Sequence, residues 1–277
     1  MSKRDSEELA HLNSQTREIV GGSLQEKIRW VRQDHFVVYP KAKRILEDLD
    51  WIITQEQTPL SDLESLTIVG ESGIGKTSIV SYFKRLHMTR INTGDYEAHT
   101  IAHCILPDAD LGLKGLYSSI LKAEPFNYPV SQSKLQRKTT IQLEEECIRQ
   151  LQNTQVKILF VDEVQHALGR KVQTTLNSLK RVLLVSGVPM VLVGTTKRTE
   201  DVLNTDDQLN DRCPIKPYSR LTPWKYDKQF RSFLKSYEMF IPFPEPSDIF
   251  SSSISKIIFN GFKMKKEQLI FDEFPDC

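Results

Sequence analysis

A phosphate-binding loop is the most specific chemical signal in the sequence, and its predicted residues are Gly70, Glu71, Ser72, Gly73, Ile74, Gly75, Lys76, Thr77 and Ser78. The segment is a complete GxxxxGK[ST] motif between an apolar run and a helical pattern, which is the context that confirms such a motif. Glycines let backbone N–H groups wrap phosphates without Cβ clashes, and the following helix N-terminus adds partial positive charge. Lys76 is expected to reach the β- and γ-phosphates, and the Thr77 hydroxyl to bind Mg²⁺. The flanking elements disfavour the alternative, a glycine-rich turn with a chance lysine.

Two carboxylates, Asp162 and Glu163, follow the apolar run ILFV downstream of this loop. We expect Asp162 to hold Mg²⁺ through water and Glu163 to orient the attacking water as a general base. A strand that simply ends in a charged loop is the ordinary alternative, which the upstream phosphate loop disfavours. Because the acids are paired, water is favoured as the nucleophile. The pair therefore predicts NTP hydrolysis rather than transfer to a small acceptor.

Thr195 and Arg212 are two further candidate residues for contact with a bound nucleotide. Thr195 follows the apolar run VPMVLVG, where a hydroxyl can contact the γ-phosphate or the attacking water. This is the role of a sensor residue. Arg212 ends the segment DQLNDR and can serve as a finger that reaches the nucleotide of a neighbouring subunit. From residue chemistry alone, a plain strand-ending hydroxyl and a solvated arginine remain open alternatives.

The elements that must position these residues alternate between apolar runs and helical patterns. Strands are expected at 65–70, 99–106, 156–161 and 188–194, and helices at 40–53, 77–87, 113–123, 133–152 and 172–187. This alternation predicts an α/β fold with a parallel sheet flanked by helices. The expected organisation is an N-terminal arm (1–28), an ATPase core (29–222) and a C-terminal helical segment (223–277).

Composition narrows the class of protein. The chain has 277 residues, of which 39% are hydrophobic and 26% charged, and these fractions fit a globular protein rather than a disordered chain or a rod. No run reaches the ~18 apolar residues of a membrane helix, and the polar N-terminus favours a cytoplasmic protein. Four scattered cysteines indicate neither a disulfide framework nor a zinc site. The net charge of +1 means that any nucleic-acid contact must come from a local patch.

The order of phosphate loop, acidic pair, threonine and arginine resembles an AAA+ ATPase, and more finely the TniB/TnsC family of transposition ATPases. The specifying segments are Phe36–Ala42, Leu176–Lys180 and Asp207–Arg212, and the resemblance covers roughly residues 28 to 260. It implies an ATP- and Mg²⁺-dependent ATPase that assembles as a homo-oligomeric ring or filament on duplex DNA. It also implies partners: a DDE transposase and a TniQ-type target selector that the protein connects.

The resemblance also assigns roles to individual residues. Lys114 matches a lysine that touches the DNA backbone, and Ser131 or Ser133 lies near a second backbone contact. Val38 and Tyr39 match a segment that packs near the adenine. A solvated lysine and ordinary core packing are the respective alternatives.

The sequence departs from the family pattern at two places. Cys213 follows Arg212 where relatives usually carry an aromatic residue. Ser253–Asn260 resembles the first helix of a C-terminal lid, but the following GFKMKKEQLIFDEFPDC does not resemble the rest, so we expect an incomplete lid after a frameshift or truncation. A non-hydrolysing ATP-binding adaptor is therefore the alternative function. A metabolic P-loop kinase is a third possibility, disfavoured by the acidic pair and Arg212.

Overall fold

The computed structural model of the protein forms two compact units. It describes residues 9–54, 63–92, 100–107, 112–123, 126, 137–154, 156–167 and 172–261. The larger unit spans Pro40–Pro223, and the smaller unit joins Met1–Tyr39 to Trp224–Cys277. The three segments expected from the sequence stay a prediction.

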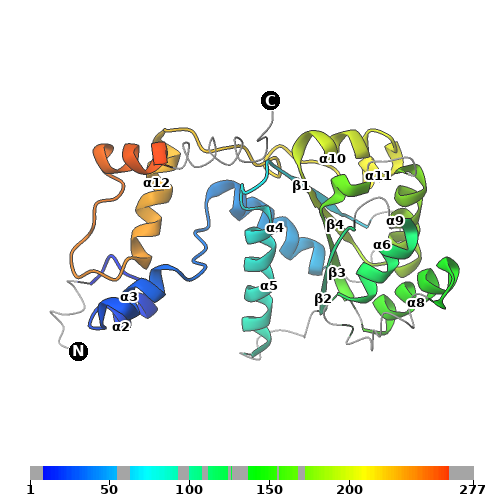
Figure 1. The fold of residues 1–277 in the computed structure, drawn as a ribbon, viewed down its shortest axis with the longest axis horizontal. Coiled ribbons are helices and arrows are strands. Elements are labelled where there is room, and N and C mark those ends of the chain that lie inside the picture. Colours follow the sequence, from blue (N-terminus) through cyan, green and yellow to red (C-terminus); the bar gives the residue numbers. More distant parts are fainter. Residues whose placement is uncertain are drawn as a thin grey trace, which may run out of the picture. The chain divides into compact units, whose positions relative to one another are not determined.

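A parallel four-stranded sheet forms the centre of the larger unit (Figure 1). The strands are β1 (Leu66–Val69), β2 (Thr100–Ile105), β3 (Val156–Asp162) and β4 (Met190–Gly194). They pair in the order β1-β4-β3-β2, and a single parallel bridge from β1 to Arg220 lies beyond β1. Every residue of β1 and β4 is buried, as expected for strands covered on both faces. The predicted parallel α/β fold is confirmed.

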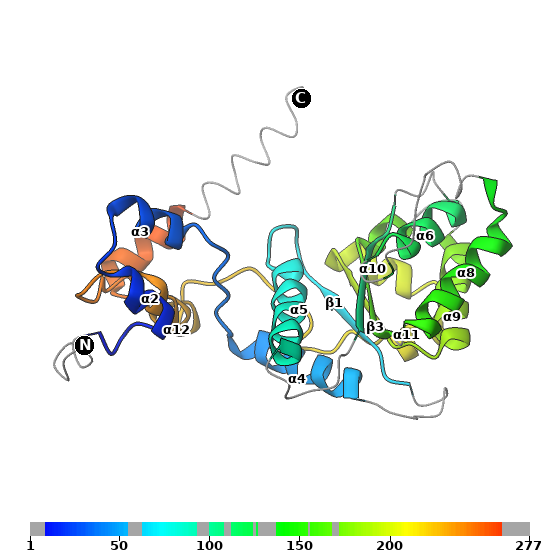
Figure 2. The same cartoon turned by 90° about the horizontal axis from the view of Figure 1, so that it is seen from below.

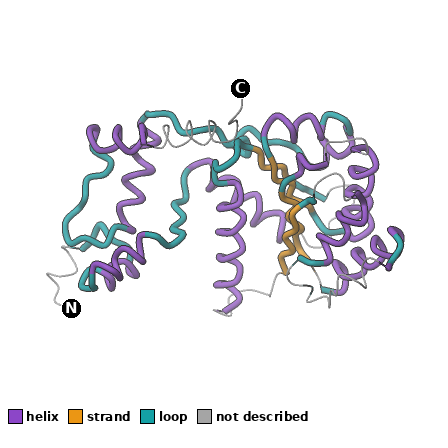
Figure 3. Tube along the Cα trace, viewed as in Figure 1, coloured by secondary structure: helices purple, strands orange, loops and turns teal. Residues whose placement is uncertain are grey.

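Helices cover the two faces of this sheet. Those on one side are α4 (Pro40–Thr54) and α5 (Lys76–Asn92), and those on the other are α6 (Gly112–Leu121), α8 (Thr140–Asn153) and α9 (Val172–Ser186) (Figure 2). Figure 3 shows the strands in orange and these helices in purple along the Cα trace. The shorter elements are η3 (Val164–Ala167), α10 (Thr196–Leu203) and α11 (Asp207–Arg212). The main apolar core lies between the sheet and the α6, α8 and α9 side.

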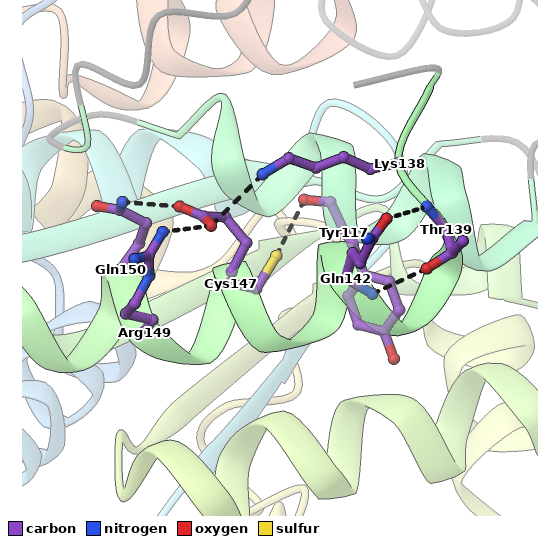
Figure 4. Close-up of polar contacts among 8 residues, drawn as sticks. Tyr117, Lys138, Thr139, Gln142, Cys147, Arg149 and Gln150 are labelled. Carbon is purple, nitrogen blue, oxygen red and sulfur yellow. Dashed lines mark hydrogen bonds and ion pairs between the residues drawn. The ribbon is translucent and has the colours of Figure 1, made fainter. Parts of the chain in front are cut away.

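Helix α8 begins at Thr140, where Thr139 caps it. The start at residue 133 that periodicity predicted lies outside the described residues. The Thr139 hydroxyl accepts a hydrogen bond from the Gln142 backbone N–H at 3.3 Å, and the Gln142 side chain accepts one from the Thr139 N–H at 2.9 Å (Figure 4). This reciprocal pair satisfies two N–H groups that a helix start leaves without partners.

The middle of α8 holds a buried carboxylate, Glu146, which is 7% exposed. It accepts a hydrogen bond from Gln150 at 3.1 Å and pairs with Arg149 and Lys138 (Figure 4). Burial raises the pKa of Glu146, but the hydrogen bonds from Gln150 and Arg149 and the charge of Lys138 outweigh it and hold that pKa below its ordinary value. These partners therefore compensate the negative charge of Glu146 inside the fold.

The smaller unit packs the start of the chain against its later part. Its helices are α2 (Ser14–Ile19), α3 (Leu24–Val31), α12 (Lys228–Tyr237), the short η4 (Glu238–Phe240) and a helix at 252–261. Asn13 donates two hydrogen bonds to the Met239 carbonyl at 3.2 Å, and the Trp30 indole donates one to the Phe240 carbonyl at 3.1 Å. Residues 9–39, expected to start with a loose arm, are therefore folded against 224–261.

The expected lid helix at Ser253–Asn260 is helical in the structure, where Phe259 packs on Tyr226 and Phe230. Residues 262–277 lie outside the described residues, so the incomplete lid stays a prediction. No helix among the described residues is long and apolar enough to cross a membrane. Cys104, Cys147 and Cys213 are free and buried.

The cap of α8 can be tested directly. We expect Thr139→Ala to lower the free energy of unfolding by about 1 kcal/mol, because the helix start loses a hydrogen-bond acceptor. Thr139→Ser keeps the oxygen and should stay close to the original stability. Urea unfolding followed by circular dichroism compares the two variants, and equal losses for serine and alanine would contradict the capping role.

Candidate functional site

The phosphate loop lies between the end of β1 and the start of α5, as the motif predicted. Gly73 and Gly75 have φ of 71° and 99°, in the left-handed region that glycine adopts without steric cost. A Cβ on Gly70 would lie 2.6 Å from a side-chain carbon of Ile74 and 3.0 Å from Cβ of Leu221. The loop therefore turns tightly into a helix N-terminus, a geometry that binds phosphate.

Lys76 is held inside this loop. It is 8% exposed, and its ammonium donates hydrogen bonds to the carbonyls of Gly70 and Glu71, both at 2.9 Å. Burial lowers the pKa of Lys76, while the carboxylates of Glu163 and Asp162 act in the opposite direction. Phosphate oxygens are stronger acceptors than carbonyls for an ammonium group, so the two carbonyl bonds are ones that a bound nucleotide can replace.

Thr77 and Asp162, the two expected metal ligands, lie together. The Thr77 hydroxyl donates a hydrogen bond to the Asp162 carboxylate at 3.2 Å. Burial raises the pKa of Asp162, but His103, the Glu163 backbone N–H and Thr77 outweigh it and hold that pKa below its ordinary value. A hydroxyl beside an ionised carboxylate is an oxygen donor set that suits Mg²⁺. Within the described ranges no cluster of three or more His, Cys, Asp or Glu residues could hold a metal ion. Thr77 and Asp162 would supply two oxygen ligands to a Mg²⁺ ion that arrives with a nucleotide.

His103 was missed by sequence reasoning, although it lies beside this acid. It is on β2, its ring Nε2 lies 3.7 Å from an Asp162 carboxylate oxygen, and its side chain is 17% exposed. Its nearness depends on the pairing of β2 with β3, where His103 lies opposite Phe160. No local spacing in the sequence gives that register.

Glu163 and Thr195 are connected through a third side chain, Gln165. The Gln165 amide N–H donates to the Glu163 carboxylate, and its oxygen accepts from the Thr195 backbone N–H at 3.0 Å. Glu163 itself has a φ of 59°, uncommon for a residue other than glycine, and its N–H donates to Asp162 at 2.8 Å. The structure therefore brings the expected base and the expected sensor into one network.

A cavity of about 670 Å³ lies beside the phosphate loop. Its lining includes Glu71 and Ser72 of the loop and Gln165 and Thr195 of the network. The Thr195 hydroxyl is buried and has no hydrogen-bond partner among the described residues. Thr195 thus lines the same cavity as the phosphate loop.

Arg212 lies elsewhere on the larger unit. It ends α11 and lines a separate hollow of about 570 Å³ with Glu64 and Ser65. Those two residues precede β1, whereas the phosphate loop follows β1, so Arg212 is at the opposite edge of the sheet from its own loop. The arrangement excludes contact between Arg212 and a nucleotide in the loop of the same chain.

The remaining predicted residues lie on α6, in the smaller unit or outside the described residues. Lys114 is exposed in the first turn of α6. Val38 is exposed, and Tyr39 packs edge-on against Trp224 with ring centroids 5.3 Å apart; burial raises the pKa of Tyr39 to about 12. Ser131 and Ser133 lie outside the described residues.

Comparisons with known proteins agree with this architecture. The sequence matches the family described as "Bacterial TniB protein" over residues 27–226. No curated protein matches it. Among solved structures, the Aeropyrum pernix ORC1 protein in complex with DNA is 16% identical with a TM-score of 0.51, over 75% of this chain and 52% of that one. AMPPCP-bound DnaA from Aquifex aeolicus is 13% identical with a TM-score of 0.47, over 86% and 68%.

The similarity to the ORC1 chain shows the predicted AAA+ fold. The chain spans about half the length of the ORC1 chain that it matches.

Lys76 provides the test of the phosphate loop. We expect Lys76→Ala to weaken ATP binding at least about tenfold, because loss of a hydrogen bond to a charged group costs about 1.5–3 kcal/mol. Lys43→Ala removes an exposed lysine of α4 and is the matched control. Fluorescent-nucleotide titration measures both, and an affinity for Lys76→Ala within about threefold of the original would refute the assignment.

Proposed function

Because the chain belongs to the TniB family, we propose that it is an ATP-dependent regulator of DNA transposition. In this proposal it binds and hydrolyses ATP in the cytoplasm and assembles on duplex DNA. It connects a TniQ-type target selector to a DDE transposase. One observation carries the ATPase part: Lys76 and Thr77, which follow β1, lie with Asp162 and Glu163 at the end of β3.

Each residue of the cluster has a defined task in hydrolysis. The loop N–H groups and Lys76 hold the β- and γ-phosphates, with the ammonium exchanging its two carbonyl partners for phosphate oxygens. Thr77 and Asp162 would hold Mg²⁺, which neutralises charge on the phosphates. Glu163 takes a proton from the attacking water, and the Thr195 hydroxyl contacts that water or the γ-phosphate.

We assign the arginine finger of this reaction to Arg212. Its position at the far edge of the sheet from its own loop suits an arginine that acts on the nucleotide of a neighbouring copy. Such a role requires a homo-oligomer, either a ring or a filament. Val38 and Tyr39 are assigned to adenine packing by resemblance to the family, and Ser131 and Ser133 to DNA on the same ground.

The proposal is tested by steady-state ATP hydrolysis with and without duplex DNA. We expect DNA to stimulate turnover, and Glu163→Gln to lower kcat by about 100-fold or more, because a general base contributes 10²–10⁴-fold. ATP affinity should stay within about threefold, since the amide keeps the shape of the side chain. Glu47→Gln, an exposed change on α4, is the control.

Two outcomes would redirect the assignment. ATP binding without turnover by the wild-type protein would favour the non-hydrolysing adaptor. Phosphorylation of a small acceptor would favour a metabolic kinase.

Lys114 provides a separate test of the DNA path. We expect Lys114→Glu to weaken binding to all duplex sequences alike, because phosphate contacts carry no base information. The slope of log K against log salt should flatten, since each neutralised phosphate contributes about −0.9 to it. Lys122→Glu reverses an exposed charge just after the other end of α6 and is the matched control. Fluorescence anisotropy at several salt concentrations measures both, and an unchanged slope for Lys114→Glu would place the DNA path elsewhere.

A further inference from the structure

We propose that Gln165 is a positioning residue that ties the general base Glu163 to the start of the sensor helix α10, so that hydrolysis depends on where Thr195 lies. This inference rests on the proposed ATP hydrolysis and adds a residue to it that no sequence motif indicated. Gln165 does not contact the reacting atoms itself, and it acts through the Glu163 carboxylate.

The contacts of the Gln165 amide carry the inference. Its N–H donates to the Glu163 carboxylate, and its oxygen accepts from the Thr195 backbone N–H at 3.0 Å. The side chain is 8% exposed, so both polar ends are buried and both are satisfied. Only a side chain with a donor and an acceptor at this length can serve both partners, because a glutamate lacks the donor and an aliphatic residue lacks both.

The turn that carries Gln165 is fixed on the larger unit. The residues beside it in η3, Val164 and Ala167, are buried at 0% and 4% exposure. The His166 backbone N–H donates to the Glu163 carbonyl at 2.9 Å, and a His166 ring nitrogen lies 3.0 Å from the Leu106 carbonyl. The backbone that carries the Gln165 side chain is therefore fixed, so the amide cannot shift freely with Glu163.

Close packing also fixes the amide on the side of β4. A Cβ added to Gly194 would lie 2.6 Å from the Gln165 side-chain oxygen and 2.2 Å from the Thr199 hydroxyl. The absence of a side chain at Gly194 is what lets the amide reach the backbone N–H of the next residue. The strand end, α10 and Gln165 are thus in direct contact, and a displacement of one displaces the others.

Thr195 gives this contact its function. Thr195 lines the cavity beside the phosphate loop, and its hydroxyl is buried and has no partner in the described part of the chain. A phosphate or water that hydrogen-bonds this hydroxyl fixes Thr195, whose N–H holds Gln165, which in turn holds Glu163. Glu163 is therefore oriented best when the Thr195 hydroxyl is bound to a phosphate or a water molecule, and hydrolysis then depends on that contact.

The test is a double-mutant cycle on hydrolysis. Gln165→Met keeps the length of the side chain but removes the amide. We expect it to lower kcat by about 10-fold or more while the KM for ATP stays within threefold. The reason is that a general base contributes 10²–10⁴-fold to the rate, and a base that is no longer held in position loses part of that factor. In a Glu163→Gln background the same change should have no further effect, because the residue acts only through the base. Gln152→Met is the matched control, since Gln152 donates a comparable hydrogen bond to the Val185 carbonyl far from the site.

A second readout is independent of turnover. Without nucleotide, the Tm loss of the Gln165→Met, Glu163→Ala double variant should be smaller than the sum of the two single losses, because both changes remove the same hydrogen bond between these side chains. If the wild type hydrolyses ATP but the kinetic effects of Gln165→Met and Glu163→Gln multiply, or KM rises in place of the kcat loss, the positioning role is overturned while the proposed function stands. If the wild type does not hydrolyse ATP, the proposed function fails, and additive Tm losses would also remove the contact on which the inference rests.

Discussion

Parallel strand pairing is the constraint on which the site depends. Because β1, β4 and β3 run in the same direction and lie side by side, the residues that follow them meet at one edge of the sheet. The phosphate loop follows β1, Glu163 follows β3 and Thr195 follows β4. Because both faces of the sheet are buried, shifting a strand by one residue would exchange the side chains packed against the two helix layers, which a close-packed core disfavours. The chemistry is thus positioned by the backbone of the sheet.

Much of this arrangement could be predicted from the sequence, because its signals are local. A glycine-rich motif between an apolar run and a helix indicates its own conformation, and an acidic pair after an apolar run indicates the end of a strand. The pairing of Thr77 with Asp162 follows once β1 and β3 run parallel in one sheet, because the segments at the carboxyl ends of both strands lie at the same edge. Those contacts require only that each residue comes next to a strand end.

What could not be predicted depends on contacts between distant segments. His103 lies beside Asp162 only because β2 pairs with β3 in a particular register, and Gln165 reaches Thr195 only because β4 inserts between β1 and β3. The packing of the smaller unit could not be predicted for the same reason. Its ring contacts join residues far apart in the chain, such as His35 and Phe240, whose ring centroids are 4.7 Å apart. Periodicity describes one helix or strand at a time and carries no information on such pairs.

The segment that leaves the larger unit is part of the same edge. The Leu221 backbone N–H donates to the Val69 carbonyl at 2.7 Å, and a Cβ on Gly70 would be crowded by Leu221 at 3.0 Å as well as by Ile74 at 2.6 Å. Lys41, at the start of α4, donates to the Arg220 carbonyl at 3.0 Å, and Arg220 pairs with Glu200 of α10. Arg220 and Leu221 therefore contact the end of β1, the phosphate loop, α4 and α10 at once, and these contacts help to fix where the loop lies at the edge of the sheet.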